Sequence, residues 1–404
     1  MKELLKKITP RFFLSGYYYA MEFLAAARYG FPGRKLKVIG ITGTKGKSTT
    51  VYLATRILEE AGLKVASSSS IELCINGKSE PQEVHVSMPS RLRLQRFLAR
   101  AKKQGCDWVV LEVTSEGLAQ CRADFINFRV ALLTNLTPEH IESHGSYENY
   151  KQAKQRLFEM LDKKEGTAIV NEDDPEAHYF LNAHKGKRVV YSVKKEKQPV
   201  ETTLMGEFNK YNALAAYTIA QTIGVKESVI RKALRDVGVV PGRLEEIKEG
   251  QDFRVFVDYA YNTSALKAVL ETVSQLKAGN SKLIVLTGSA GGGRDRWRRP
   301  VMGEIAARYA DIVMVTSEDS FGEDPSKIIQ EVRAGSEKVK REGKEVGIYS
   351  IEDRKKAIKK VLQLAQKHDI VLLAGMGMEL SLATQKGEIP WDERKIVREI
   401  LRSL

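Results

Sequence analysis

The chain has 404 residues, of which 43% are apolar and 29% are charged, and its formal net charge is +14. This composition is typical of a soluble globular protein, and the length suggests two or three domains with sizeable cores. The three cysteines, Cys74, Cys106 and Cys121, have no paired spacing of a metal site and form no disulfide framework. We therefore expect a cytoplasmic protein in a reducing compartment.

The positive charge favours an anionic partner, such as a nucleotide, a phosphorylated substrate, a nucleic acid or an acidic membrane surface. The sequence has neither zinc-finger spacing nor the aromatic pattern of RNA-binding sheets. A dense basic run has the spacing of a solvated helix face: Arg354, Lys355, Lys356, Lys359 and Lys360. We therefore expect no nucleic-acid partner.

The N-terminal segment, Met1 to Phe31, combines basic residues with an apolar and aromatic run. The basic residues come first, and they are Lys2, Lys6, Lys7 and Arg11. Glu22 interrupts the apolar run and Arg28 follows it, which argues against a membrane span, and no convincing signal-peptide cleavage pattern is present. Two interpretations remain: a helix docked on the protein's own core, or an interfacial helix on an anionic membrane.

A phosphate-binding loop is predicted between Leu36 and Thr50, where the sequence reads Leu-Lys-Val-Ile-Gly-Ile-Thr-Gly-Thr-Lys-Gly-Lys-Ser-Thr-Thr. An apolar run is followed by a glycine-rich turn and then by a helical pattern, as in loops that bind polyphosphates. In that motif, Lys47 pairs with the β- and γ-phosphates and Ser48 holds Mg²⁺. The chain is therefore expected to bind ATP or GTP, although Ile41 stands where the generic motif has glycine.

Strand-like runs alternate with helical patterns after this loop. Trp108–Glu112 and 130–134 read as strands, and Leu92–Gln104 and 148–161 read as helices. The alternation predicts an α/β fold with a parallel sheet, in which ligands bind at the carboxyl ends of the strands. Glu112 falls at such an end and Asn135 just beyond another, so both are placed where chemistry is expected.

A second α/β unit is predicted after Pro241. Its expected strands are 253–257, 282–286, 312–316 and 370–373. We expect an N-terminal helical segment at 1–35, a P-loop ATPase domain at 36–240 and a Rossmann-like domain at 241–404. The segment from Gly288 to Pro300 combines glycines with four arginines, so it is either an anion cradle or a mobile surface loop.

Further motifs follow the phosphate loop in order along the chain. They are Glu112-Val-Thr-Ser-Glu-Gly-Leu118, Thr134-Asn-Leu-Thr-Pro-Glu-His140, His144-Gly with Tyr150-Lys-Gln-Ala-Lys154, Phe208-Asn-Lys-Tyr-Asn-Ala-Leu-Ala-Ala216, Gly242-Arg-Leu-Glu245 and Val257-Asp-Tyr-Ala260. With the loop, whose family version tolerates a residue such as Ile41, this series resembles the Mur ligase family. The residues of these motifs most resemble those of the family branch that adds the third residue of the peptidoglycan stem peptide. The resemblance runs from about residue 36 to about residue 395.

The resemblance implies an ATP-dependent ligase that makes an acyl phosphate and then an amide. Transfer of a phosphoryl group between two anions requires that its charge be neutralised. The residues implied as catalytic are Lys47, Lys154, His140 and Arg243. The residues implied as ligands of two Mg²⁺ ions are Ser48, Glu112, His140 and Lys154, with Lys154 carbamylated. The alternatives are a hydrogen-bonded loop histidine at His140 and a solvated helix lysine at Lys154.

The resemblance also implies a set of ATP contacts. They are Gly43, Thr44, Gly46, Lys47, Ser48, Thr49, Asn209, Asn212, Arg243 and Asp258. In this set Asn209 and Asn212 contact adenine, although such amides also serve as helix caps. Asp258 accepts from the ribose and Arg243 reaches the γ-phosphate. Because these two belong to or border the C-terminal domain, the site is expected to form when the domains close.

The sequence departs from the family pattern on the substrate side. Only the first 35 residues precede the predicted strand of the loop, so the family's UDP-binding N-terminal domain is expected to be lacking. Phe321 replaces the arginine that grips diaminopimelate, so that amino acid is not expected. The carboxylates of this acceptor region suit a cationic amine such as lysine or ornithine, or else are surface groups: Glu318, Asp319 and Glu379. Ser115 and Arg122 are expected near the acyl substrate, with a surface arginine as the alternative for Arg122.

Three functions remain open from the sequence. The first is a Mur-type ligase that joins an amino acid to an anionic acyl substrate, either a small molecule or a lipid-linked one. The second is a folylpolyglutamate or poly-γ-glutamate type of ligase, which shares the ATPase core. The third is a non-catalytic, nucleotide-binding partner subunit. We expect a monomer in the cytoplasm, with a peripheral membrane contact through the N-terminal segment as a further option.

Overall fold

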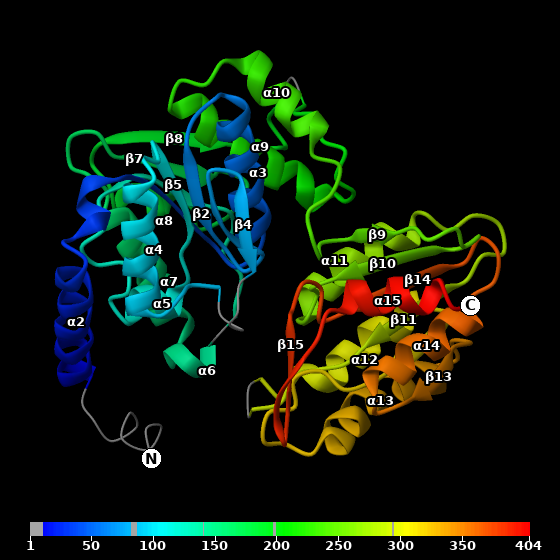
Figure 1. Ribbon diagram of the computed structural model, residues 1–404. Coiled ribbons are helices and arrows are strands. Elements are labelled where there is room, and N and C mark those ends of the chain that lie inside the picture. Colours follow the sequence, from blue (N-terminus) through cyan, green and yellow to red (C-terminus); the bar gives the residue numbers. More distant parts are fainter. Residues whose placement is uncertain (1–10, 82–86, 140, 197–198, 293–294) are drawn as a thin grey trace. The chain divides into compact units, whose positions relative to one another are not determined.

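The computed structural model describes residues 11–81, 87–139, 141–196, 199–292 and 295–404, with side chains described from residue 14 and not at 81. The described chain divides into two compact units (Figure 1). The first comprises residues up to Thr203 together with Phe208–Gly238, and the second comprises Leu204–Glu207 together with Val239–Leu404. Each unit has its own sheet and its own core, so each is described by itself.

The first unit is built on an eight-stranded sheet with the order β4-β3-β2-β5-β1-β6-β7-β8. Its strands are β1 (Lys37–Thr42), β2 (Val65–Ser68), β3 (Glu72–Ile75), β4 (Lys78–Pro81), β5 (Trp108–Glu112), β6 (Phe128–Leu133), β7 (Thr167–Asn171) and β8 (Lys187–Tyr191). Its helices are α2 (Arg11–Arg28), the short 3-10 helix η1 (Pro32–Lys35), α3 (Lys47–Glu60), α4 (Arg91–Lys103), α5 (Ser115–Ala119), α6 (Ile141–His144), α7 (Tyr147–Glu159), α8 (Ala177–Asn182), α9 (Glu207–Thr222) and α10 (Glu227–Asp236).

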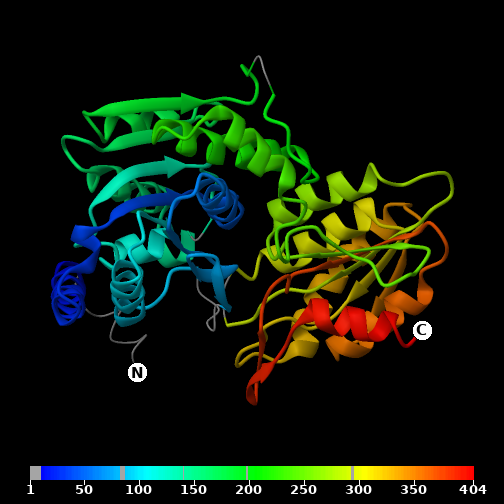
Figure 2. The same cartoon turned by 45° about the horizontal axis from the view of Figure 1, so that its top comes forward.

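The central strands of this sheet are parallel and nearly continuous in apolar residues. β1 pairs with β5 on one side and with β6 on the other, both in parallel. Helices α4, α7 and α8 cover one face, and α3 packs on β1, β2 and β5 from the other, with α10 packed against α3 (Figures 1 and 2). Strands buried on both faces have no polar side to expose, which explains their unbroken Val, Ile and Leu runs. The carboxyl ends of β1, β5 and β6 therefore lie next to one another.

One edge of the largely parallel sheet carries antiparallel strands. β2, β3 and β4 form an antiparallel meander. The turn between β3 and β4 is Asn76-Gly77, and both residues have positive φ values, 51° and 75°. This backbone favours Asn-Gly and matches the twist of a tight hairpin. The expected parallel sheet is confirmed for its central strands, and this hairpin adds an antiparallel edge that the Asn-Gly pair signals.

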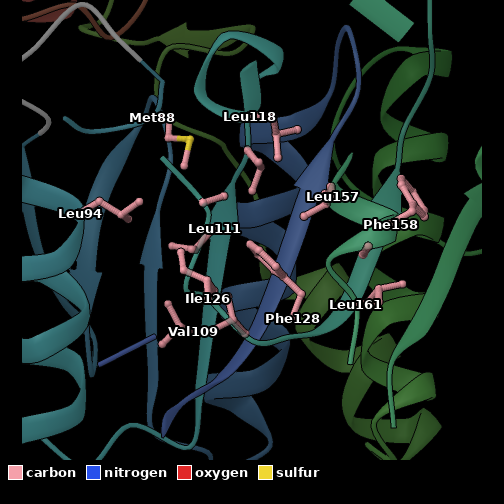
Figure 3. Close-up of a cluster of buried hydrophobic side chains, with 14 of the residues drawn as sticks. Met88, Leu94, Val109, Leu111, Leu118, Ile126, Phe128, Leu157, Phe158 and Leu161 are labelled. Atoms are coloured by element: carbon pink, nitrogen blue, oxygen red, sulfur yellow. The ribbon is translucent and has the colours of Figure 1, made fainter. Parts of the chain in front are cut away.

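The core of the first unit packs α7 closely onto β1 (Figure 3). A Cβ atom on Gly40 of β1 would lie 2.7 Å from Leu157 Cδ1 and 2.8 Å from a ring carbon of Phe128. Only glycine leaves room for these two side chains, because real carbon atoms do not approach so closely. Gly40 thus lets α7 lie against the strand that leads into the phosphate loop.

The second unit contains a six-stranded sheet with the order β13-β12-β11-β14-β10-β9 and a separate hairpin, β15-β16. Its strands are β9 (Glu245–Ile247), β10 (Arg254–Asp258), β11 (Leu283–Thr287), β12 (Ile312–Val315), β13 (Gly347–Ser350), β14 (Ile370–Ala374), β15 (Ser381–Thr384) and β16 (Gly387–Pro390). Its helices are α11 (Thr263–Ser274), α12 (Arg298–Tyr309), α13 (Pro325–Arg341), α14 (Arg354–Leu364) and α15 (Glu393–Leu401). Among the described strands of the six-stranded sheet, β9 alone pairs antiparallel. The expected Rossmann-like arrangement is confirmed.

Candidate functional site

The phosphate loop connects β1 to α3 and is held by the residues that follow β6. The N–H of Thr44 donates to the backbone oxygen of Asn135 at 2.9 Å. The N–H of Lys45 donates to Asn135 Oδ1 at 3.0 Å, and Asn135 Nδ2 donates back to the Lys45 oxygen at 3.1 Å. Asn135 therefore lies just past a strand end, as predicted, and it also holds the phosphate loop in place through hydrogen bonds. The sequence did not reveal this second role.

Two glycines of the loop are required by both backbone angle and space. Gly43 and Gly46 have φ values of 145° and 80°. A Cβ on Gly43 would lie 1.9 Å from Thr134 Oγ1, and one on Gly46 would lie 2.2 Å from Asn212 Oδ1. A side chain at either position would meet both strain and collision. The loop thus packs tightly against Thr134 and Asn212. Its glycines allow the tight backbone turn that a polyphosphate site needs.

Lys47 lies at the first position of α3 and folds back over the loop. Its Nζ donates to the backbone oxygens of Gly43 at 3.1 Å and Thr44 at 2.9 Å. The N-terminus of a helix presents unpaired N–H groups and a positive dipole end, which favour an anion. The loop, the helix end and the Lys47 charge therefore fit a nucleotide polyphosphate.

Oxygen groups converge beside this helix end. Glu112 Oε2, at the end of β5, accepts from Ser48 Oγ at 2.8 Å. The same oxygen accepts from the Ser70 N–H at 3.0 Å and its hydroxyl at 3.2 Å. Hydroxyl and carboxylate oxygens beside phosphates are how proteins commonly hold Mg²⁺. Ser48 and Glu112 therefore fit a cation that substrate phosphates also hold. The described residues contain no group of three or more His, Cys, Asp and Glu that could hold a metal ion.

Lys154 projects from α7 into the interior beneath the loop. Only 2% of it is exposed, so the alternative of a solvated helix lysine is wrong. Its Nζ donates to the Gly43 oxygen at 2.7 Å and lies 4.7 Å from the centre of the Tyr150 ring. Burial, and then the charge of Lys47, lower the pKa of Lys154 well below its ordinary value. Burial therefore weakens the preference of this nitrogen for the ammonium form.

Other groups around the loop were not foreseen from the sequence. Tyr150 OH and Thr44 Oγ1 lie 2.9 Å apart, and the Thr44 hydroxyl also accepts from the Thr137 N–H. Burial lowers the pKa of Lys45 to about 8, with Glu139 opposing this shift and Lys47 adding to it. Ser70 belongs to a run of four serines, Ser67–Ser70, and this run is the sequence feature that could have drawn attention to Ser70. His140 lies outside the described residues.

The predicted adenine contacts lie close to the loop. Asn209 and Asn212 are buried on α9, and Asn212 Nδ2 donates to Asn209 Oδ1 at 2.9 Å. Because Asn212 Oδ1 also faces Gly46, α9 brings both amides to the phosphate loop. Thr49 is buried in the first turn of α3.

The two residues expected near the acyl substrate lie beyond β5. Ser115 Oγ and His144 Nε2 lie 3.1 Å apart in a buried contact. Arg122 is half-buried, and it donates to the Met88 oxygen at 3.1 Å and to Gln120 Oε1 at 2.7 Å. Arg122 is therefore anchored by the protein and is not a freely solvated surface arginine.

In the second unit, Asp258 ends β10 and is buried. Its Oδ2 accepts from the Leu244 N–H at 2.7 Å, and burial raises its pKa to about 6 although Arg243 opposes the shift. The Arg243 guanidinium carbon lies 4.7 Å from the centre of the Tyr259 ring. The G-R-L-E and V-D-Y-A motifs are thus joined within one unit.

Each of the three carboxylates of the acceptor region accepts a hydrogen bond within the second unit. Glu318 is buried, accepts from the Gly288 N–H at 3.1 Å, and has its pKa raised by burial to about 7. Asp319 Oδ1 accepts from the Ala383 N–H at 2.7 Å, and the Phe321 N–H donates to the oxygen of the same alanine at 3.2 Å. Glu379 instead accepts from the hydroxyl of Tyr259 at 2.5 Å. For Glu318, the alternative of a surface carboxylate is wrong.

The predicted anion cradle between Gly288 and Pro300 is only partly described. The buried Arg299 donates to Glu323 and Glu331, and the exposed Arg296 also pairs with Glu323. An arginine whose charge is already neutralised by two carboxylates attracts an added anion weakly. The cradle prediction is therefore wrong for Arg299.

Comparison with known proteins identifies two family domains in the chain. The family model of the Mur ligase middle domain matches residues 41–199. The family model of the Mur ligase glutamate ligase domain matches residues 242–377. The two matches contain the phosphate loop with Glu112 and Lys154, and Arg243 with Asp258, respectively.

Curated relatives extend the match over nearly the whole chain. A UDP-N-acetylmuramoyl-L-alanyl-D-glutamate–2,6-diaminopimelate ligase of Syntrophomonas wolfei is 36% identical, covering 95% of this chain and 82% of the relative. A UDP-N-acetylmuramyl-tripeptide synthetase of Roseiflexus is 37% identical with the same coverages, 95% and 82%. A relative of this identity and coverage shares both fold and family with the chain.

Solved structures give the same result for the fold. A diaminopimelate ligase structure has a TM-score of 0.60 at 28% identity, covering 91% of this chain and 78% of the other. A folylpolyglutamate synthase of Mycobacterium tuberculosis, complexed with ADP and AMPPCP, has a TM-score of 0.72 at 16% identity, covering 88% and 92%. At that identity the second likeness shows the fold alone. The polyglutamate alternative therefore fits less well than the stem-peptide branch.

Proposed function

We propose a residue-level mechanism from the premise that the chain belongs to the Mur ligase family and is an ATP-dependent, ADP-forming acid–amino-acid ligase. It adds an amino acid to an acyl substrate in the synthesis of peptidoglycan precursors. The observation that carries the mechanism is the buried contact between Lys154 Nζ and the Gly43 oxygen. This contact holds the Lys154 amine beneath the phosphate loop, which supports a role for it at the phosphates. With this family assignment, the non-catalytic alternative is set aside.

The first chemical step is phosphorylation of the acyl carboxylate. A carboxylate oxygen attacks the γ-phosphorus of ATP, the bond to the bridging oxygen breaks, and ADP leaves. Lys47 and the N–H groups of the loop stabilise the charge that spreads over the phosphoryl oxygens. Asn209 and Asn212 hold adenine, Asp258 holds the ribose and Arg243 contacts the γ-phosphate. Thr44 and Thr49 complete the nucleotide site.

The second step forms the amide. The amine of the amino acid attacks the carbonyl carbon of the acyl phosphate, the C–O bond breaks, and phosphate leaves with its electron pair while the nitrogen loses a proton. Ser115 and Arg122 position the acyl substrate. The acceptor amino acid lies near Glu318, Asp319, Phe321 and Glu379, and the buried acidic group at Glu318 suits a cationic side chain.

Magnesium ions complete the charge balance of this site. Ser48 and Glu112 would hold one ion, and His140 with a carbamylated Lys154 would hold a second. Carbamylation joins the neutral Lys154 nitrogen to the carbon of CO₂ and releases a proton. The product is an anion, which could face a cation where an ammonium could not. Bound Mg²⁺ would polarise the phosphoryl oxygens and neutralise their charge.

The remaining assignments belong to the same proposal. The domains are 1–35, 36–240 and 241–404, and the enzyme is a cytoplasmic monomer. Its acyl substrate is anionic and either free or lipid-linked. The N-terminal segment makes a peripheral contact with a membrane. Within the described ranges, none of the helices has the length and hydropathy that a bilayer-crossing segment requires.

The proposal is tested by phosphate release with a panel of acyl substrates and amino acids. We expect turnover of ATP only when an acyl substrate with a peptide carboxylate and a matching amino acid are both present. The products should be ADP, phosphate and one new amide in equal amounts. The ligase mechanism would be contradicted if no acyl substrate stimulated ATP turnover with any amino acid in the panel.

A further inference from the structure

Helix α2 presents its apolar side outward and buries its charge. Glu22 is fully buried, whereas Leu24 is 61% exposed and Tyr17 is 58% exposed. The other large apolar residues on the outward side are Tyr19, Met21 and Phe23. In an ordinary surface helix the apolar stripe faces the core and the charged side faces water. The reversed arrangement of α2 therefore needs an explanation.

Specific polar contacts hold the inward side of α2 against α4. Glu22 Oε1 accepts from Gln95 Nε2 at 2.8 Å, and its other oxygen lies 3.8 Å from Arg91 Nε. The Arg91 guanidinium carbon also lies 5.0 Å from the centre of the Tyr18 ring. A buried carboxyl is costly to leave without these partners. The rotation of α2 is thus fixed, and its aromatic side stays outward.

The apolar surface continues past the end of the helix. Phe23, Phe31 and Phe125 pack with ring centres 5.6–5.8 Å apart, and Tyr19 lies 5.2 Å from Phe125. The Arg34 guanidinium carbon lies 4.8 Å from the Phe31 ring centre. An arginine that lies along aromatic rings at the rim of an apolar surface can direct its charge to a polar boundary. We call this surface, from Tyr17 to Leu24 with Phe31 and Phe125, the aromatic face.

Charge in the stretch of sequence around α2 is almost all of one sign. The only acidic residue between positions 14 and 35 is the buried Glu22. The exposed charged residues there are Arg28, Arg34 and Lys35. The sequence before residue 12 adds Lys2, Lys6, Lys7 and Arg11, with Glu3 as the one acid. An apolar surface with a basic border is complementary to a bilayer that carries anionic headgroups.

We infer that the aromatic face docks onto an anionic lipid bilayer, with α2 lying in the plane of the interface. Its 18 residues span about 27 Å, and tyrosine and phenylalanine suit the headgroup boundary. A second copy of the chain is the poorer occupant, because a symmetric contact would bring two basic borders of a +14 chain together. The inference specifies the membrane contact named in the proposed function, and it does not depend on the chemistry at Lys154.

The test is sedimentation of the full chain with lipid vesicles. We expect binding to vesicles of phosphatidylcholine with phosphatidylglycerol, weaker binding to phosphatidylcholine alone, and a decrease as salt rises. The double variant Phe23→Glu/Leu24→Glu should lower binding at least about tenfold, because it places charge on the inserting side. The matched control is Val190→Glu/Tyr349→Glu, which adds the same charge at exposed apolar positions elsewhere and should bind like the unaltered chain.

Circular dichroism and ATP turnover of each variant separate docking from folding and from catalysis. A folded α2 variant that turns over ATP but does not sediment supports the inference. The inference is overturned if the full chain does not bind anionic vesicles, or if the α2 variant and the control bind equally. It is also overturned if the α2 variant instead dissociates a dimer. Vesicle binding without any acyl-dependent turnover would contradict the proposed ligase mechanism alone.

Discussion

The side-chain nitrogen of Lys154 lies 2.7 Å from the backbone oxygen of Gly43, which ties the middle of α7 to the first residue of the phosphate loop. Gly40 permits this arrangement because it lets Leu157, on the same helix, pack against β1. Burial and the nearby charge of Lys47 disfavour the ammonium form of Lys154 and so lower its pKa. Packing therefore fixes the position of this amine and lowers its pKa.

Replacement of Lys154 by alanine is expected to abolish most of the ligase activity. If Lys154 carries a carbamate, removal of this anion should lower turnover by about 10²–10³-fold, the cost typical of one lost electrostatic contact in an active site. Added short carboxylates should restore part of the rate by occupying the vacated space. The matched control is Lys151→Ala on the same helix, which should retain activity. Full activity of Lys154→Ala without added carboxylate would remove the proposed role.

Substitution of Gly46 by alanine separates space from backbone strain. Gly46 and Gly62 have nearly the same φ, 80° and 79°, but only the former has a close neighbour, Asn212. Both substitutions should cost about 1–2 kcal/mol of unfolding free energy from strain. Only Gly46→Ala should also weaken binding of a non-hydrolysable ATP analogue, measured by calorimetry. Equal nucleotide affinity in the two variants would show that the contact with Asn212 does not shape the nucleotide site.

The contact between Ser48 and Glu112 predicts a change in the magnesium requirement. Glu112→Gln keeps a hydrogen-bond acceptor for Ser48 but removes the negative charge. The Mg²⁺ concentration at half-maximal turnover should therefore rise about 10–100-fold. Glu116→Gln changes an exposed carboxylate in the following helix and serves as the control. An unchanged magnesium titration for Glu112→Gln would place the ion elsewhere.

The buried carboxyl of Asp258 predicts a pH-dependent stability. Burial raises its pKa from an ordinary 3.8 to about 6, so the folded protein holds this proton more tightly than the unfolded chain does. The stabilisation from this group is complete below about pH 4 and is lost as the pH rises through 6, by about 3 kcal/mol in total. Denaturant unfolding of the chain and of Asp258→Asn across this range measures the difference, since the asparagine side chain does not titrate.

No pH-dependent difference between the two proteins from pH 4 to pH 7 would contradict this assignment of Asp258. The asparagine amide oxygen can still accept from the Leu244 N–H, so the local hydrogen bond survives in the variant. The measurement therefore reports the charge of the carboxylate, not the loss of its backbone partner.

Much of the fold could be predicted from strand and helix periodicity. Trp108–Glu112 is the strand that was predicted, and Ile312–Val315 differs from its prediction at one end. Periodicity assigns the faces of a helix but not which face is buried. Glu22 illustrates this limit, because its partners Gln95 and Arg91 lie far away in the sequence. The aromatic face of α2 therefore could not be foreseen from the pattern alone.

Motifs in the sequence predicted which residues form the site, but they did not predict how these residues are arranged in space. The spacing of Lys47 and Ser48 predicts a phosphate loop because the motif is local. The burial of Lys154 depends on the packing of α7 against β1, which no local pattern contains. Likewise, Asn135 contacts Lys45 across 90 residues of sequence. The interactions that shape the loop are long-range, which is why sequence reasoning missed them.

Transfer of a heavy oxygen isotope tests the central claim most directly. An acyl substrate whose carboxylate carries the heavy isotope is incubated with ATP, Mg²⁺ and the amino acid, and the released phosphate is analysed by mass spectrometry. Formation of an acyl phosphate requires one labelled oxygen to leave with each phosphate, and the amide keeps the other. Phosphate that carries no label while amide accumulates would contradict the mechanism.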